Sequence, residues 1–346
     1  MRNILKAATL ESKFPVLSVE RGCILSKDAD VTVGFKVRLP ELFTLTSAEY
    51  AAMHGAWVKA IKVLPCYTVV HRQDWFLEEK YRAVTGRDDM GFLDRSFELH
   101  FNERPFLNHY AYLFITRTTR ERSLQQSNFS IPREARHREA VVRFMESVDQ
   151  FERIMGDSGL VGLERLTTDE IVGTGKKAGI IEKYFSLSQE NTTTLKDISL
   201  SPAEMRIGDE ILSVHTLSDA DDLPAAVRTD GRFEKYSTDR SDCRLSFAAP
   251  VGLMLSHNHI YNQYVFMDDP ADTLQRLEKT ARNMQSLSRY SRANQINRQW
   301  IEEYLNEAHS FGLIPVRCHC NVMAWSDDRD ELKRIRNDVG SQLALM

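Results

Sequence analysis

The sequence lacks the motifs by which most enzymes are recognised. No Ser-His-Asp or Cys-His arrangement stands out, and no pair of carboxylates lies in an apolar context that would separate two pKa values. A phosphate-binding loop needs G-x-x-x-x-G-K-[ST], but Gly175-Lys176 is followed by Lys177, and the position five before Gly175 is Glu170. We therefore expect the Gly-Thr-Gly stretch to be a solvated loop, and we predict that this chain is not itself an enzyme.

Cysteine is scarce, and its number and spacing argue against a disulfide-stabilised scaffold and against a structural zinc site. The five cysteines are scattered and odd in number, and no C-x-x-C pair is present to build a four-ligand zinc site. The first ten residues do not have the form of a signal peptide. These observations predict reduced thiols in a cytoplasmic protein. The cysteines are Cys23, Cys66, Cys243, Cys318 and Cys320.

Long hydrophobic runs and a dominant charge are also missing. The longest charge-free window, 245–267, contains Pro250, His257, Asn258, His259 and Asn262, whose polar groups would be unsatisfied in hydrocarbon. We expect paired strands there and no transmembrane helix, so that any membrane association comes through a partner or a surface patch. The net charge of −4 creates no global field that would recruit nucleic acid.

What is present is the composition of an ordinary globular protein, with 346 residues, 42% hydrophobic and 27% charged. Short β-rich runs alternate with amphipathic helical patterns, which predicts an α+β fold with two lobes of mixed sheet packed with helices in βαβ-like units. We place the lobes at residues 1–160 and 161–346, with an irregular connection over 160–200. Expected helices include one after a Thr46/Glu49 capping box and one introduced by Ser130 and Pro132, with the apolar stripe Val141, Phe144, Met145, Val148, Phe151 and Met155. Asp269-Pro270 starts another helix, and the helix after it carries Ile296, Trp300, Ile301, Leu305 and Ala308 and ends at Gly312.

The stretch from Phe101 to Ile115 is a polar turn followed by a run that is apolar on both period-2 faces. This pattern predicts a central strand covered on both sides, although a buried helical segment remains an alternative for so short a run. Glu103 and Arg104 in the turn form a polar clasp. It either holds the turn through an internal ion pair or a backbone cap, which we favour, or meets a partner.

Two groups of residues suggest metal ligands. His257 and His259 share one face of a predicted strand, with His215 or Asp268 as a distant third ligand, and satisfied sheet histidines are the alternative we favour. Cys318 and Cys320 flank His319, and strand alternation predicts packed core thiols instead of ligands. We predict no metal and no other cofactor in this chain.

One charge feature remains. Six basic residues lie between positions 276 and 298 against a single acid, Glu278. A basic helical face of this kind binds nucleic acid, anionic lipid or an acidic protein surface, or is simply solvated. We take it as the possible interaction surface of the chain. Its members are Arg276, Lys279, Arg282, Arg289, Arg292 and Arg298.

The strand at 101–115 also resembles a known family, and the resemblance runs through most of the chain. It includes the following segments: Met1–Lys6, Phe14–Leu17, Gly22–Asp28, Thr32–Phe35, Leu39–Phe43 and the region 282–300. These segments resemble the N-terminal domain of the TraG proteins of Bacteroides-type conjugative transposons, relatives of the type IV secretion ATPases of the TraC, TrbE and CagE group.

The resemblance implies the N-terminal part of a conjugation motor ATPase whose ATP and Mg²⁺ chemistry belongs to a C-terminal domain absent from this chain. It implies an assembly and interaction role: docking to inner-membrane conjugation components, homo-oligomer formation in the full-length protein, no small-molecule substrate, and a cytoplasmic, peripheral location at the inner membrane through partners. Direct contact with DNA stays open. The alternative function is a stand-alone metal-dependent or nucleic-acid-binding protein that uses His257, His259 and the basic face.

Overall fold

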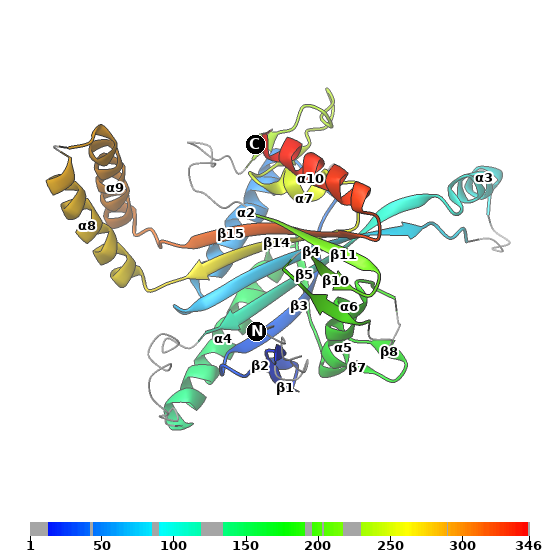
Figure 1. Cartoon of the computed structure of the whole chain (residues 1–346), viewed down its shortest axis with the longest axis horizontal. Helices are drawn as coiled ribbons and strands as arrows, with labels where there is room; N and C mark the ends of the chain where they lie inside the picture. Colours follow the sequence, from blue (N-terminus) through cyan, green and yellow to red (C-terminus); the bar gives the residue numbers. More distant parts are fainter. Residues whose placement is uncertain are drawn as a thin grey trace, which may run out of the picture.

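The computed structural model describes residues 13–41, 44–84, 90–118, 134–190, 196–202, 204–216, 230–288 and 290–344. Within these ranges the chain is an α+β protein with nine helices and a sheet of eleven strands (Figure 1). The prediction of an α+β fold is confirmed. From one edge to the other the strands are β1 (Val16–Glu20), β2 (Cys23–Ser26), β3 (Val31–Arg38), β5 (Pro105–Arg117), β4 (Thr68–Lys80), β14 (His259–Met267), β15 (Arg317–Ser326), β11 (Glu210–Thr216), β10 (Met205–Ile207) and β9 (Ile198–Leu200), with β6 (Gly162–Arg165) also paired to β3.

The two halves of the sheet repeat one topology. In the first half α2 (Ser47–Lys62) connects β3 to β4, and β5 returns between them; in the second, β11 leads through α7 (Ala249–Leu253) to β14, and β15 returns between them. β3 and β4 therefore run parallel with an antiparallel strand between them, which is a split βαβ unit. β4 and β14 meet antiparallel at the centre, from Thr68–Met267 to Phe76–His259, so the halves are related by an approximate two-fold axis.

This arrangement fixes where the hairpin ends point. Each half inserts helices at the end of its β-hairpin: α3 (Phe92–Phe101) between β4 and β5, and α8 (Pro270–Leu287) with α9 (Arg292–Phe311) between β14 and β15. Because β4 and β14 are antiparallel, the insertions project from opposite ends of the sheet (Figure 1). We call them the α3 arm, residues 81–104, and the α8–α9 hairpin, residues 268–316.

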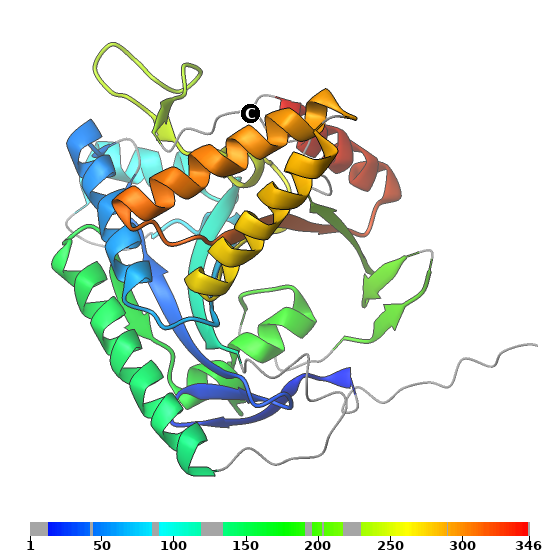
Figure 2. The same cartoon turned by 90° about the vertical axis from the view of Figure 1, so that its left-hand side faces the viewer.

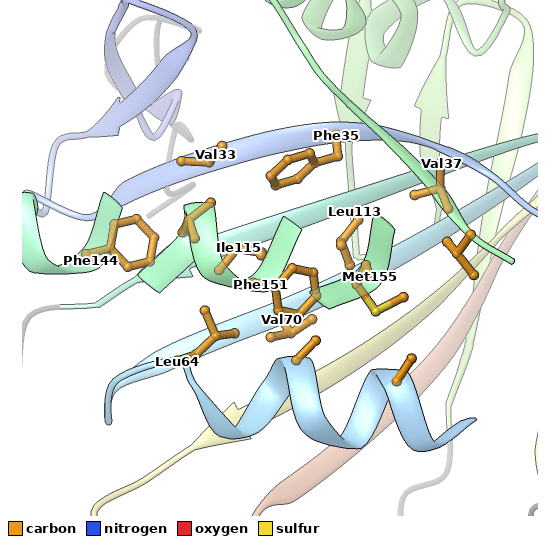
Figure 3. Packing of buried hydrophobic residues seen from close by; sticks show 14 of the residues in the cluster. Val33, Phe35, Val37, Leu64, Val70, Leu113, Ile115, Phe144, Phe151 and Met155 are labelled. Atoms are coloured by element: carbon orange, nitrogen blue, oxygen red, sulfur yellow. The ribbon is translucent and has the colours of Figure 1, made fainter. Parts of the chain in front are cut away.

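One face of the sheet buries its apolar side chains under α2 and α4 (Glu134–Asp157), and Figure 2 shows these two helices together on one side. Phe144, Phe151 and Met155 of α4 are fully buried against Phe35 and Leu113 (Figure 3). Full burial of one such side chain contributes about 2–3 kcal/mol. The predicted apolar stripe of this helix is therefore confirmed, and so is the central strand at 105–117, whose residues 111–115 are buried.

Two further clusters complete the core. On the same face, Val322 and Ala324 of β15 pack with Ile335 of α10 (Arg329–Ala344) and with α7. On the opposite face, Trp75 and Trp325 pack under residues of α5 (Thr168–Val172) and α6 (Ile180–Ser186). β7 (Gly173–Thr174) and β8 (Lys177–Ala178) form a tight hairpin between α5 and α6, while β12 (Gly231–Arg232) pairs with β13 (Arg244–Leu245).

Local signals in the sequence account for several helix boundaries. At the start of α2, the Thr46 hydroxyl accepts from the Glu49 N–H at 3.2 Å, and the Glu49 carboxylate accepts from the Thr46 N–H at 2.8 Å. These hydrogen bonds lower the pKa of Glu49. Asp269 caps α8, with Pro270 in the first turn, and Gly312 ends α9 at φ +60°. All three signals were predicted from the sequence.

Several predictions need correction. The sheet is not mixed, because the returning strand of each half inserts between the two parallel ones and makes every neighbouring pair of described strands antiparallel. The 245–267 window is not only paired strands, since it contains the short helix α7 with Pro250 in its first turn. Residues 160–190 are not irregular, because they contain α5 and α6, which cover the sheet. The division at residue 160 stays a prediction, while strands from both sides of it share one sheet.

Candidate functional site

The α3 arm extends β4 and β5 beyond the covered part of the sheet. Its base is closed by backbone hydrogen bonds from the Tyr81 N–H to Arg104 O at 3.0 Å and from the Glu103 N–H to Tyr81 O at 2.8 Å. Beyond them, the Ala83 N–H donates to the Asn102 side-chain oxygen at 3.1 Å. These bonds hold α3 at the end of a rigid two-stranded support.

α3 is oriented with its charged side toward that support. The Glu98 carboxylate accepts from the Tyr81 hydroxyl at 2.9 Å and from the Val84 N–H at 2.8 Å. No residue of the helix is buried among those described, and its apolar side chains face outward. The exposed fractions are 83% for Phe92, 79% for Leu93, 58% for Phe97, 60% for Leu99 and 37% for Phe101.

Such an outward apolar helix is unusual, because an amphipathic helix normally buries its apolar stripe against its own domain. The sequence analysis did not predict α3. The available signal was the spacing of Leu93, Phe97 and Phe101, four residues apart, with Arg95 and Glu98 on the other side. Exposed groups of large apolar side chains mark contact surfaces, so α3 is the principal candidate site of the molecule.

The predicted clasp lies at the base of this arm. Glu103 and Arg104 are both exposed, and Glu103 adopts φ +60°. The Arg104 guanidinium lies 5.6 Å from the centre of the Phe101 ring and 3.4 Å from the His100 ring nitrogen Nδ1. Within the described residues no ion pair joins Glu103 to Arg104. The turn is held by backbone bonds, and Arg104 packs on α3.

The second projection is the α8–α9 hairpin, whose two helices pack mainly on each other. Ala281, Leu305 and Ala308 form its buried seam. Ile296 and Trp300 were predicted to face inward with them, and this is wrong: they are 40% and 63% exposed. A two-helix hairpin standing away from the sheet has only a narrow seam to bury, so the adjacent apolar positions stay in solvent.

The basic residues predicted as an interaction surface lie on this hairpin. Arg276, Lys279, Arg282 and Arg292 are exposed and Arg298 is half-buried, while Arg289 lies outside the described residues. Arg298 pairs with Glu302 at 2.7 Å, and Arg282 approaches Glu278 at 3.7 Å. Among the described residues Lys279 and Arg292 have no ion pair. The structure therefore gathers the described members of the set on one projecting element.

The two histidines have separate partners. The ring of His257 lies between Glu331 and Asp338 of α10, each at 3.2 Å. The fully buried ring of His259 faces the carbonyl oxygens of His257 and Gly252, both at 2.7 Å. The two rings do not converge, because His257 precedes β14 and turns toward α10.

The other residues suggested as metal ligands have hydrogen-bond partners of their own or do not form a cluster. His215 contacts the Ser213 hydroxyl at 3.0 Å, and Asp268 accepts from Arg317. Cys318 is exposed and Cys320 is half-buried. The prediction of a core thiol is wrong for Cys318, because this end of β15 runs out toward the hairpin. Across the described residues no cluster of three or more His, Cys, Asp or Glu side chains could hold a metal ion.

Polar side chains that the sequence analysis missed line the seam between β4 and β14. On one face, buried Asp74 is paired with Arg72 at 2.9 Å and His109 at 2.8 Å. On the other, the Asn262 side-chain oxygen accepts from Gln73 at 2.8 Å and lies 2.9 Å from the His71 ring. The Asn262 contacts cross the boundary between the repeated halves, whereas the Asp74 contacts join β4 to β5 within the first half; only the fold brings these residues together.

A cleft of about 830 Å³ lies beside the base of the α3 arm, between Tyr110, Gln189 and Lys196. The Tyr110 hydroxyl donates a hydrogen bond of 2.5 Å to Glu79. Burial raises the pKa of Tyr110, and this hydrogen bond raises it further. Burial also raises the pKa of Tyr112, which donates to Gln189, to about 12. Both acidic and basic residues line the cleft, so its lining selects no single ligand charge.

Gly175 and Lys176 form the turn between β7 and β8. Thr174, Lys176 and Lys177 are exposed there. This is a short β-hairpin between two helices, as opposed to the strand–loop–helix geometry in which backbone N–H groups cradle phosphates.

No helix in the described part of the chain combines the length and apolar character needed to cross a bilayer. Comparison with known families gives one match: the family described as "Domain of unknown function, B. Theta Gene description (DUF3875)" matches residues 3–55. No curated protein matches the chain. The matched segment ends within α2, so neither the α3 arm nor the α8–α9 hairpin belongs to it.

Proposed function

We propose that this chain is the N-terminal assembly and interaction domain of a conjugation motor ATPase of the type IV secretion class. In this role it docks the motor to inner-membrane transfer components at the cytoplasmic side and contributes to oligomer formation. The motivation is the sequence resemblance to TraG-type proteins. The observation that carries an assembly role is the orientation of α3, whose Glu98 is tied to Tyr81 while Leu93 and Phe97 face solvent.

A second copy of the chain is the partner that fits α3 best. The described charges of the arm balance, with Arg82, Arg95 and Arg104 against Asp94, Glu98 and Glu103. Two copies of such a surface do not repel each other. In a two-fold contact, Asp94 of one copy can face Arg95 of the other while the aromatic side chains are buried between them.

The test combines a physical and a genetic measurement. Leu93→Asp with Phe97→Asp places charges in the proposed contact, and Val142→Asp on α4 is the matched control because Val142 is 51% exposed on a different helix. We expect the native chain to self-associate in light-scattering measurements, the double variant to be monomeric, and the control to behave as the native chain.

In donor cells, the same double variant in the complete gene should lower the frequency of DNA transfer, and the control should not. A native chain that stays monomeric at high concentration contradicts self-association through α3. Unchanged transfer in cells carrying the double variant contradicts the conjugation role. ATP turnover by this chain alone would contradict an assembly domain without a motor.

A further inference from the structure

Charge is separated along the α8–α9 hairpin. The half nearest the turn carries Lys279, Arg282, Arg292 and Arg298 and, among the described residues, no acid. The half nearest the sheet carries the opposite charge. Its acidic residues are Asp268, Asp269, Asp272, Glu278, Glu302, Glu303 and Glu307, and its basic ones are Arg276 and, when protonated, His309, which lies 3.9 Å from Glu278. The pair Arg298–Glu302 marks the boundary.

Apolar side chains are exposed in the same basic half. Leu287 at the end of α8 is 50% exposed, and Tyr290 in the turn is 85% exposed. Ile296 and Trp300 follow one and two turns into α9, on one side of that helix, and are also exposed. Within the described residues nothing covers this end, because the buried seam consists of the inward positions of the two helices.

We propose that the end of the α8–α9 hairpin binds the surface of an anionic lipid bilayer directly. Basic side chains are attracted to the negative surface potential, and tyrosine and tryptophan prefer the headgroup region, where one part of the ring is apolar and the other wet. The acidic half near the sheet disfavours contact along the whole hairpin. The charge pattern therefore orients the chain with the turn toward the bilayer.

The apolar residues decide between lipid and the other anionic partners. A nucleic acid offers phosphates to the arginines and bases to Tyr290 and Trp300, but it buries aliphatic side chains such as Leu287 and Ile296 poorly. The boundary between headgroups and acyl chains accepts both kinds of side chain. A helix of twenty residues spans about 30 Å, so α9 can hold the turn well away from the sheet.

The contact is local to the hairpin, and it differs from docking through a protein partner. It leaves α3 free at the opposite end of the sheet (Figure 1). The inference does not rest on the proposed conjugation role, since it concerns only the chemistry of this hairpin.

The experiment is co-sedimentation of the full chain with vesicles of phosphatidylcholine alone and of phosphatidylcholine mixed with phosphatidylglycerol. Two variants test the hairpin: K279Q/R282Q/R292Q for charge and L287S/W300S for the apolar residues. The matched control removes three exposed charges from α10, as K333Q/R334Q/R336Q. Circular dichroism establishes that each variant is folded.

We expect the native chain and the α10 control to bind the mixed vesicles in a salt-sensitive manner and the neutral vesicles weakly. The charge variant should bind the mixed vesicles roughly a hundredfold more weakly, because each basic residue near an anionic bilayer strengthens binding several-fold. The apolar variant should lose binding that persists at high salt.

Three results would overturn the proposal. The first is no sedimentation of the native chain with mixed vesicles, and the second is equal loss of binding in the α10 control. The third is displacement of the chain from mixed vesicles by single-stranded DNA at equal phosphate concentration, which would assign the hairpin to nucleic acid.

Discussion

The Tyr81 hydroxyl donates a hydrogen bond of 2.9 Å to the carboxylate of Glu98, and this contact ties α3 to the strand that supports it. Glu98 also accepts from the Val84 N–H. The charged side of α3 is therefore occupied by its own support, and its apolar side is left facing away from the molecule. Orientation of an exposed helix by one carboxylate gives the assembly proposal a precise structural basis.

This contact has a spectroscopic consequence. The bond to Glu98 is the main cause that raises the pKa of Tyr81, because it favours the protonated phenol. We expect Glu98→Gln to lower the pKa of Tyr81, as followed by NMR of ring-labelled tyrosine. Glu103→Gln, an exposed change at the base of the same arm, should leave the titration of Tyr81 unaltered. A Tyr81 titration that is the same in Glu98→Gln and in the native chain would show that α3 is not held this way in solution.

The core beneath α4 should respond strongly to truncation. Phe151 is fully buried and lies 6.1 Å from Trp57 of α2, measured between ring centres. We expect Phe151→Ala to lower the free energy of unfolding by about 3–5 kcal/mol, because it removes buried apolar surface and leaves a cavity. Val142→Ala, on the exposed side of the same helix, should change it by less than about 0.5 kcal/mol. Urea denaturation of the two variants measures the difference.

The Arg72–Asp74 ion pair should contribute more to the free energy of unfolding than an ion pair on the surface does. The side chain of Asp74 is 4% exposed. Burial raises its pKa, but Arg72 and His109 lower it further, so that the net shift is downward. Arg72→Met leaves His109 as the remaining partner of the buried Asp74 carboxylate. We expect this substitution to lower the free energy of unfolding by about 3 kcal/mol at neutral pH. Arg38→Met breaks the exposed pair with Glu164 and should cost less than about 1 kcal/mol.

The acid dependence of the same pair has a definite sign. The pKa of Asp74 is lower in the folded state, so its contribution is present above the ordinary carboxyl pKa and is lost as the pH falls through the lowered value. The free energy of unfolding should therefore decline less on acidification in Arg72→Met than in the native chain. Equal costs for Arg72→Met and Arg38→Met would contradict the buried pairing.

Half-buried His71 should make the fold sensitive to mild acid. Its ring stacks on Tyr264 at 4.1 Å, and burial lowers its pKa, opposed by the contact with Asn262. The neutral ring is favoured in the folded state, so stability is full above the unfolded value of about 6.5 and falls as the pH drops below it. We expect His71→Phe, which keeps the stack, to weaken this decline. His54→Gln, on the exposed side of α2, should not. Urea denaturation at several pH values distinguishes them.

The sequence by itself determined the elements whose signals are local. Thr46 and Glu49 predict the start of α2, because the capping box satisfies backbone groups within four residues. Asp269-Pro270 and Gly312 likewise predict where the α8–α9 hairpin begins and ends, because their signals are also local. The sequence also predicted the core. The helical stripe from Phe144 to Met155 and the strand up to Ile115, which is apolar on both faces, could be identified because side chains repeat at a fixed period in each type of element.

Tertiary structure decided everything that depends on partners distant in sequence. Neighbouring described strands are antiparallel because β5 and β15 insert between strands that run parallel to each other. No local sequence pattern encodes that insertion. His257 and His259 share a strand pattern, yet one faces α10 and the other a buried carbonyl pair. Ile296 and Trp300 have the spacing of a buried stripe but remain exposed, because burial requires a neighbouring surface and their helix stands away from the sheet. Amphipathic spacing thus determines which side of a helix is apolar, whereas the fold alone determines whether that side is covered.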